Sequence, residues 1–107
     1  MSMYKLIAVY TTPPDPAAFD AHFNDTHLPL VRTIPGLSRI VVNRGVAPPW
    51  GGEAGAYQLV EMHFVDEQSF KSAMTSAENV ATGRDLRAFA KGLVTLHVVH
   101  EVRNEVM

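Results

Sequence analysis

The segment Tyr57-Gln58-Leu59-Val60-Glu61-Met62-His63-Phe64 alternates between two kinds of side chain. Its even positions are Gln58 and three apolar residues, whereas its odd positions mix aromatic, aliphatic and charged groups. Successive side chains of a β-strand point to opposite faces of the sheet. The alternation therefore predicts a strand over 57–64 that turns one apolar face to a core and a mixed face the other way.

Two strands and one helix are expected before this segment. Short runs rich in β-branched and aromatic residues predict strands over 3–10 and 37–45. Between them, Asp15 is placed as an N-cap, and apolar residues at helical spacing predict a helix over about 16–26. Pro29 removes a backbone hydrogen bond, so we expect a separate or kinked turn over about 28–34. The Pro- and Gly-rich stretch 46–55 predicts a long loop.

Two helices and a last strand are expected after it. Asp66 is a second expected N-cap, and Thr75 with Glu78 matches the capping-box spacing that opens another helix. Gly83 is a potential break in that helix. β-branched residues predict a strand over 93–102. The order βαββαβ is that of the ferredoxin-like α+β fold, a four-stranded antiparallel sheet with helices on one face. We expect a single domain over residues 1–107.

Composition excludes several classes of function. The net charge of −2 offers no basic surface for nucleic acid or for an anionic membrane. The chain has no Cys, which excludes disulfides, thiolate metal sites and cysteine nucleophiles. No His spacing matches a metal motif, and His22 and His27 would lie roughly 140° apart on an ideal α-helix. Met1–Tyr10 lacks the regions of a signal peptide, and no apolar run spans a bilayer, so we expect a cytoplasmic protein.

The mixed face of the predicted sheet suggests self-association. Leu59, Glu61 and His63 share it, and both faces of the two outer strands carry β-branched residues. An apolar sheet face left without a covering layer usually marks an interface. We therefore expect two copies to pack these faces together as a homodimer. The pair would enclose a partly polar chamber near His27.

The segment Phe23-Asn24-Asp25-Thr26-His27-Leu28-Pro29-Leu30, followed by Ile34-Pro35-Gly36-Leu37, resembles the motif of the EthD family. These are small proteins of the dimeric α+β barrel superfamily, and the resemblance extends over essentially the whole chain. It implies a ferredoxin-like fold assembled as a dimeric α+β barrel. The wider superfamily includes cofactor-free monooxygenases, muconolactone-type isomerases, polyketide cyclases and haem-processing enzymes. EthD itself is associated with the bacterial degradation of ethyl tert-butyl ether.

His27 is the first candidate for chemistry. Its imidazole titrates near neutral pH, so it can move a proton or donate to a developing oxyanion. The resemblance also places the motif histidine of the family at this position. Six other side chains could line a substrate pocket, although each also has an ordinary structural interpretation. They are His63, His97, Tyr57, Tyr10, Trp50 and Arg44.

These features predict a cofactor-free enzyme of the isomerase, cyclase or monooxygenase type. Its substrate would be a small hydrophobic, oxygenated metabolite of bacterial catabolism, bound in a pocket of the dimeric barrel without metal or cofactor. Two alternatives stay open. One is a non-catalytic small-molecule binding or accessory protein. The other is a haem-handling protein, which the lack of a haem-attachment motif disfavours.

Overall fold

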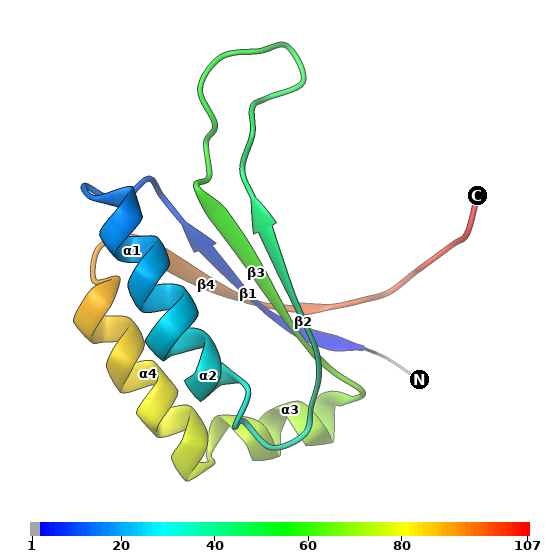
Figure 1. Cartoon of the computed structure of the whole chain (residues 1–107). Helices are drawn as coiled ribbons and strands as arrows, with labels where there is room; N and C mark the ends of the chain where they lie inside the picture. The colour runs from blue at the N-terminus through cyan, green and yellow to red at the C-terminus, as the bar shows by residue number, and fades with distance from the viewer. Residues whose placement is uncertain (1–2) are drawn as a thin grey trace.

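The sheet of this protein is antiparallel and has four strands in the order β2-β3-β1-β4. We describe residues 3–107 from a computed structural model; Met1 and Ser2 lie outside the described part. The strands are β1 (Tyr4–Tyr10), β2 (Leu37–Arg44), β3 (Gln58–Phe64) and β4 (Val94–His100). Each pairs with its neighbours in antiparallel register. This is the expected ferredoxin-like arrangement (Figure 1).

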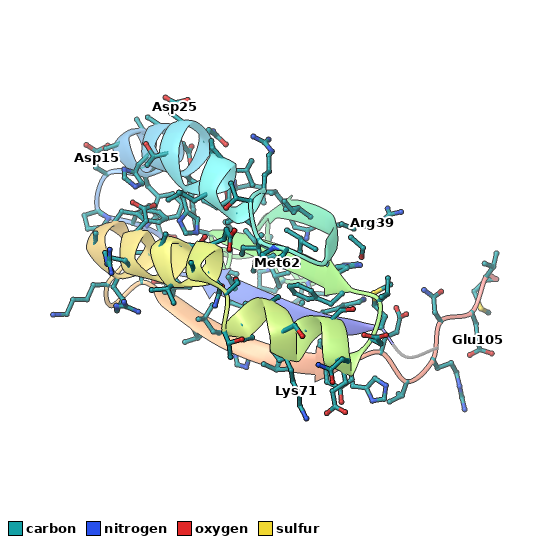
Figure 2. The ribbon with its side chains drawn as sticks, turned by 90° about the horizontal axis from the view of Figure 1, so that it is seen from below. Asp15, Asp25, Arg39, Met62, Lys71 and Glu105 are labelled. Carbon is teal, nitrogen blue, oxygen red and sulfur yellow. The ribbon has the colours of Figure 1, made fainter. Side chains whose placement is uncertain are left out.

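The helices form a second layer on one face of the sheet (Figures 1 and 2). They are α1 (Pro16–His22), α2 (Leu28–Val31), α3 (Glu67–Met74) and α4 (Ala77–Phe89). In Figure 2 the labelled Met62 lies between the two layers. The molecule has principal extents of 38 × 38 × 20 Å, as a slab of two layers requires. The other face of the sheet has no helix over it among residues 3–107.

The first helical segment differs from the sequence expectation. The chain is helical without a break from Pro16 to Val31, because a π-helical turn over Phe23–His27 joins α1 to α2. The N–H of Leu28 donates to the carbonyl of Phe23, five residues back. This wider turn ends one hydrogen-bond ladder and begins the next, so Pro29 falls in the first turn of α2. A missing donor is tolerated there, and the proline does not end the helix.

Three helices begin at residues whose side chains bond the backbone of the first turn. Asp15 and Asp66 are N-caps, and each carboxylate accepts the backbone N–H three residues later, as predicted. The expected capping box is shifted by one residue, because Ser76 rather than Thr75 caps α4. Thr75 instead ends α3. Gly83 does not break α4, since tertiary contacts outweigh its weak helix propensity.

The core lies between the sheet and the helices. The buried positions of β3 are its even ones, so the predicted apolar face is correct. β1 contributes Ala8 and Tyr10 to the same side, and α1 and the π turn contribute Phe19 and Phe23. The remaining buried apolar side chains are Val31, Ile34, Val60, Met62, Phe64, Ala73 and Ala90.

Two segments extend beyond this slab (Figure 1). The connection between β2 and β3 projects from the end of the sheet, and residues 101–107 run away from β4. The radius of gyration is 14.6 Å, whereas a compact domain of this length has about 13 Å. No helix among the described residues is long and apolar enough to cross a membrane.

Candidate functional site

A cavity of about 250 Å³ lies between the sheet and the helices. Its walls are mainly apolar and come from all the strands except β2, and from α2, α3 and α4. Five polar residues also line it: Tyr10, His27, Asn79, Thr82 and Arg87. An apolar cavity with a few polar groups has the composition of a small-molecule site. Two of the sequence-predicted residues, His27 and Tyr10, therefore meet in one cavity.

His27 is held by a single strong contact. The side chain is buried, with 4% of its surface exposed, and its Nδ1 lies 2.9 Å from Oδ2 of Asp85. Because a carboxylate only accepts, Nδ1 carries the proton in the neutral ring, and Nε2 then has a lone pair. Within residues 3–107, Nε2 has no hydrogen-bond partner. It is the nitrogen available to the cavity.

Asp85 also holds a second histidine. Nε2 of His22 lies 2.9 and 3.1 Å from the two carboxylate oxygens of Asp85. Ideal α-helical geometry separates His22 from His27 by roughly 140°. The π turn between them accommodates an extra residue, so two positions five apart can reach the same carboxylate. The separation expected for an ideal α-helix therefore does not keep the two rings apart.

An aromatic frame fixes both imidazoles. The Phe89 ring centroid is 4.6 Å from that of His22 and 4.8 Å from that of His27. Phe23, in the π turn, approaches the ring of His27 at 5.8 Å. Rings held on several sides lose little further freedom when a ligand binds. The histidine pair is thus preorganised by α4 and by the π turn.

The environment favours neutral His27. Burial lowers the pKa of His27 below its ordinary value of 6.5, although the hydrogen bond and the charge of Asp85 oppose this change. At neutral pH the ring is therefore uncharged and able to accept a proton at Nε2. The nearby carboxylate would then stabilise the imidazolium that forms.

Tyr10 offers a complementary group. Its side chain is buried, with 1% of its surface exposed, and it lines the cavity that contains His27. Burial, reinforced by the charge of Asp85, raises the pKa of Tyr10 far above its ordinary value of 10. The phenol therefore stays protonated at any physiological pH. It is a hydrogen-bond donor placed in the same cavity as a proton acceptor.

Tyr57 and Arg44 lie outside this cavity. The hydroxyl of Tyr57 donates to Asp20 of α1 at 2.8 Å, and Arg44 bonds the same carboxylate at 3.2 Å while lying over the tyrosine ring. Tyr57 precedes the first paired residue of β3, so the alternation of that strand does not apply to it. Its ring packs against Phe19, on the helical side of the sheet. Both side chains join the β2–β3 connection to α1.

His63 and His97 lie on the opposite face of the sheet from His27. The register aligns His97, Ile7 and Glu61 across β4, β1 and β3, and places His63 in the next row of the same face. The expectation of one chamber shared with His27 is therefore wrong, because the sheet separates the two groups. His63 instead bonds Glu61 at 3.1 Å.

Trp50 is also distant from the cavity. It lies in the projecting β2–β3 connection with 86% of its surface exposed. It does not line the cavity that contains His27. A role for Trp50, His63, His97, Tyr57 or Arg44 in binding substrate stays a prediction. The structure places none of them beside His27.

Sequence reasoning missed Asp85, Asn79 and Thr82. The positions 79, 82, 83, 86 and 87 follow helical spacing, which puts them on one stripe of α4 facing the cavity. This stripe mixes polar and apolar residues, so it gives no hydrophobic signal. Asp85 lies 58 positions from His27 in the chain, and only the packing of α4 against the π turn joins them. Pro29 inside a helical pattern was the one available hint of irregular geometry.

The sequence matches the EthD domain model over residues 12–92. The chain belongs to the EthD domain family. The crystal structure of an ethyl tert-butyl ether D (EthD) family protein from Bacillus halodurans is 44% identical, with a TM-score of 0.88, over 94% of this chain and 99% of that one. An uncharacterized 11.0 kDa protein from the thcB-thcC intergenic region of Rhodococcus erythropolis is 35% identical, over 88% of this chain and 90% of its own.

More distant structures share the EthD fold. SnoaB from Streptomyces nogalater, a cofactor-independent oxygenase, has a TM-score of 0.65 and 16% identity, over 100% of this chain and 98% of its own. A dimeric protein of unknown function with a ferredoxin-like fold, from Bacteroides fragilis, has a TM-score of 0.60 and 18% identity, over 92% of this chain and 93% of its own. At these identities the likeness concerns the fold alone.

Among residues 3–107 no group of three or more His, Asp or Glu side chains is arranged to hold a metal ion. The ring nitrogens of His22 and His27 both lie against the carboxylate of Asp85, and its Oδ2 is 3.1 and 2.9 Å from them. The cluster is therefore suited to fixing the tautomer and the orientation of His27. That function of a carboxylate is typical of sites where an imidazole exchanges protons.

Proposed function

We propose that this EthD-family protein is a cofactor-independent enzyme that removes a proton from a small, apolar, oxygenated molecule. The observation that carries the proposal is the buried His27, whose Nδ1 is held by Asp85 at 2.9 Å while Nε2 is left for the cavity. Its lowered pKa keeps it an acceptor at neutral pH. Isomerases, cyclases and cofactor-free oxygenases share such a first step.

In the proposed step, a C–H bond beside a carbonyl breaks and its proton goes to Nε2 of His27. The electron pair moves to the carbonyl oxygen, which becomes an enolate. Asp85 stabilises the resulting imidazolium through Nδ1–H. For a phenolic substrate the proton leaves oxygen instead of carbon, and the phenolate keeps the electron pair.

Tyr10 completes the proposed site. Its neutral hydroxyl donates to the oxygen on which charge develops, and this interaction strengthens as the charge grows. Most of the cavity wall is apolar, which lowers the local dielectric and strengthens the interaction with this donor. A base and a donor in one small cavity are what enolisation requires.

We also propose that the protein acts as a homodimer through the uncovered sheet face. That face carries apolar residues beside a polar group in which Lys5 lies 3.3 Å from Glu101 and 3.8 Å from Glu61. An uncovered face of this kind favours a second copy over permanent hydration. The fold relative from Bacteroides fragilis is described as dimeric, which supports the same assembly here.

Hydrogen–deuterium exchange at carbon tests the proposed step with simple ketones in place of the natural substrate. The protein is incubated in D₂O with 1-tetralone, 2-tetralone and 1,3-cyclohexanedione, and mass spectrometry follows deuterium incorporation. We expect catalysed exchange that His27→Gln reduces by about 10²–10⁴-fold. Tyr10→Phe should reduce it by about 10²-fold. His100→Gln, on the outer end of β4, is the matched control and should retain the rate.

Two results would decide against catalysis by His27. Exchange no faster than in buffer for every probe would remove the proposed activity. If a probe nevertheless binds and is recovered unchanged, the protein is a non-catalytic binding protein, the alternative that the sequence left open. Equal rates for the native protein and His27→Gln would assign the exchange to another group.

A further inference from the structure

A second hollow adjoins the cavity at His27. It has a volume of about 470 Å³ and lies between α4 and β4. The two hollows share Gly83, Leu86, Arg87 and Leu96 in their walls, so they are neighbouring parts of one depression. β4 is an edge strand, lying below α4 in the view of Figure 2. The depression therefore leads from the buried imidazole to the outside of the molecule.

The strand side of this depression is apolar and open. Leu96 of β4 is 50% exposed, although it belongs to the helix-facing side of the strand with Val94. Leu86 and Ala90 of α4 face it from the other side. A half-exposed apolar wall continuous with a cavity is suited to an apolar molecule longer than the cavity itself.

The helix side of the depression is basic. Arg87 of α4 and Lys91, two residues beyond the end of that helix, line it, and no Asp or Glu lines either hollow among residues 3–107. Neither cation takes part in an ion pair or a side-chain hydrogen bond within residues 3–107. The guanidinium lies back over Gly83, where Nη1 is 3.5 Å from the point at which a side chain would begin. The guanidinium therefore lies beside Gly83, which lines both hollows.

We propose that the molecule bound at His27 is an amphipathic anion, with its apolar body in the cavity and along Leu96, and its anionic group at Arg87 and Lys91. This inference rests on the proposed function and adds the substrate class to it. Guanidinium and ammonium groups bind carboxylates or phenolates by charge-assisted hydrogen bonds. In a protein whose net charge is −2, two unpaired cations beside an acid-free depression favour an anion at this place.

Matched pairs of ligands test the proposal. The probes are 2-naphthoate with 2-naphthamide, and 4-phenylbutyrate with 4-phenylbutyramide, which differ in charge but little in shape. Isothermal titration calorimetry at low salt compares the native protein with Arg87→Gln, Lys91→Gln and the double variant. Arg84→Gln is the control, because it removes the same charge from α4 at a residue that lines neither hollow. Circular dichroism checks that each variant is folded.

We expect the native protein to bind each acid at least about tenfold more tightly than its amide. The double variant should lose this preference, whereas Arg84→Gln should keep it. Added salt should weaken only the acids. Failure of the acids to bind, equal affinity for acid and amide, or a preference that survives in the double variant would overturn the proposal. So would an equal loss in Arg84→Gln, which would indicate a general effect of charge.

His27→Gln separates this inference from the proposed function. The preference for acids should persist in His27→Gln, because the variant keeps both cations. A preference that persists while no probe exchanges deuterium would refute catalysis and leave the anion site standing. Exchange that depends on His27 without any preference for acids would refute only the anion site.

Discussion

At His27, one ring nitrogen is committed to a carboxylate and the other is left for an apolar cavity. The two nitrogens differ only because Asp85 accepts from one of them, and Asp85 is itself fixed by His22. Phe89 lies against both rings and limits their rotation. The chemistry proposed for His27 therefore depends on side chains that never touch the substrate.

Asp85→Asn tests this positioning. In the native protein, ¹⁵N NMR of the imidazole should give a pKa of His27 below 6.5 and a neutral ring protonated at Nδ1. Asp85 opposes the effect of burial, so its replacement should lower that pKa further. Activity in the exchange assay should fall through loss of orientation. A pKa of His27 that rises in Asp85→Asn would contradict the assignment.

His27 also makes the stability of the protein depend on pH. The folded pKa of His27 is lower than the unfolded one, so the unfolded chain binds more protons just below pH 6.5. The free energy of unfolding should therefore fall as the pH drops from 7 through this range.

The carboxylate of Glu61 contributes to the pH dependence of stability at lower pH. Partial burial would raise its pKa, but hydrogen bonds with His63 and Asn43 and the charge of Lys5 keep this pKa below 4.5.

At the scale of elements, the π turn and α4 decide where the polar groups meet. The π turn places His22 and His27 over one carboxylate. α4 presents Asp85 to α1 and a different stripe, from Asn79 to Arg87, to the cavity. The start of α4 fixes the rotation of both stripes, because helical positions follow one another by about 100°.

Ser76→Ala tests that start. Ser76 accepts the N–H of Asn79 at 3.1 Å, so its replacement should lower the free energy of unfolding by about 1 kcal/mol. Thr75→Ala is the neighbouring control and should cost clearly less, since Thr75 does not cap α4. Urea unfolding at pH 7 measures both. A larger loss in Thr75→Ala would mean that α4 begins one residue earlier.

At the scale of the whole molecule, the sheet divides the polar residues into two groups. His27, Tyr10 and Asp85 lie on the helical side, whereas Glu61 and His63 lie on the uncovered side. The projecting β2–β3 connection and the extended residues 101–107 are exposed beyond the slab (Figure 1). No helix covers the second side among residues 3–107, which is why we propose that this side forms a dimer.

Leu59→Glu tests the dimer. Leu59 lies on the uncovered face between Val9 and Asn43, so the new carboxylate would have no charged neighbour across the strands. Burying it in an interface should weaken association by roughly 100-fold or more. Val42→Glu is the control, at a 45% exposed position on the other face of β2. Sedimentation should give a dimer for the native protein and Val42→Glu, and a monomer for Leu59→Glu. A native monomer at micromolar concentration would refute the dimer.

The sequence by itself determined the order of the elements, the caps at Asp15 and Asp66 and the buried face of β3. These features depend on interactions within a few residues, which a local pattern records directly. It also identified His27 and Tyr10 as candidates, and the structure brings these two together in one cavity.

Only the tertiary structure decided which candidates share a site. His22 and His27 reach one carboxylate because the helix between them is not an ideal α-helix, and periodicity arguments assume that it is. Asp85 joins them across 58 residues, a distance at which no local pattern carries information. His63 and His97 have the same side-chain chemistry as His27, but they lie on the opposite face of the sheet and so belong to another surface. Which side of a sheet a residue occupies is fixed by strand register and by the layer that covers it, and both form only when the chain packs.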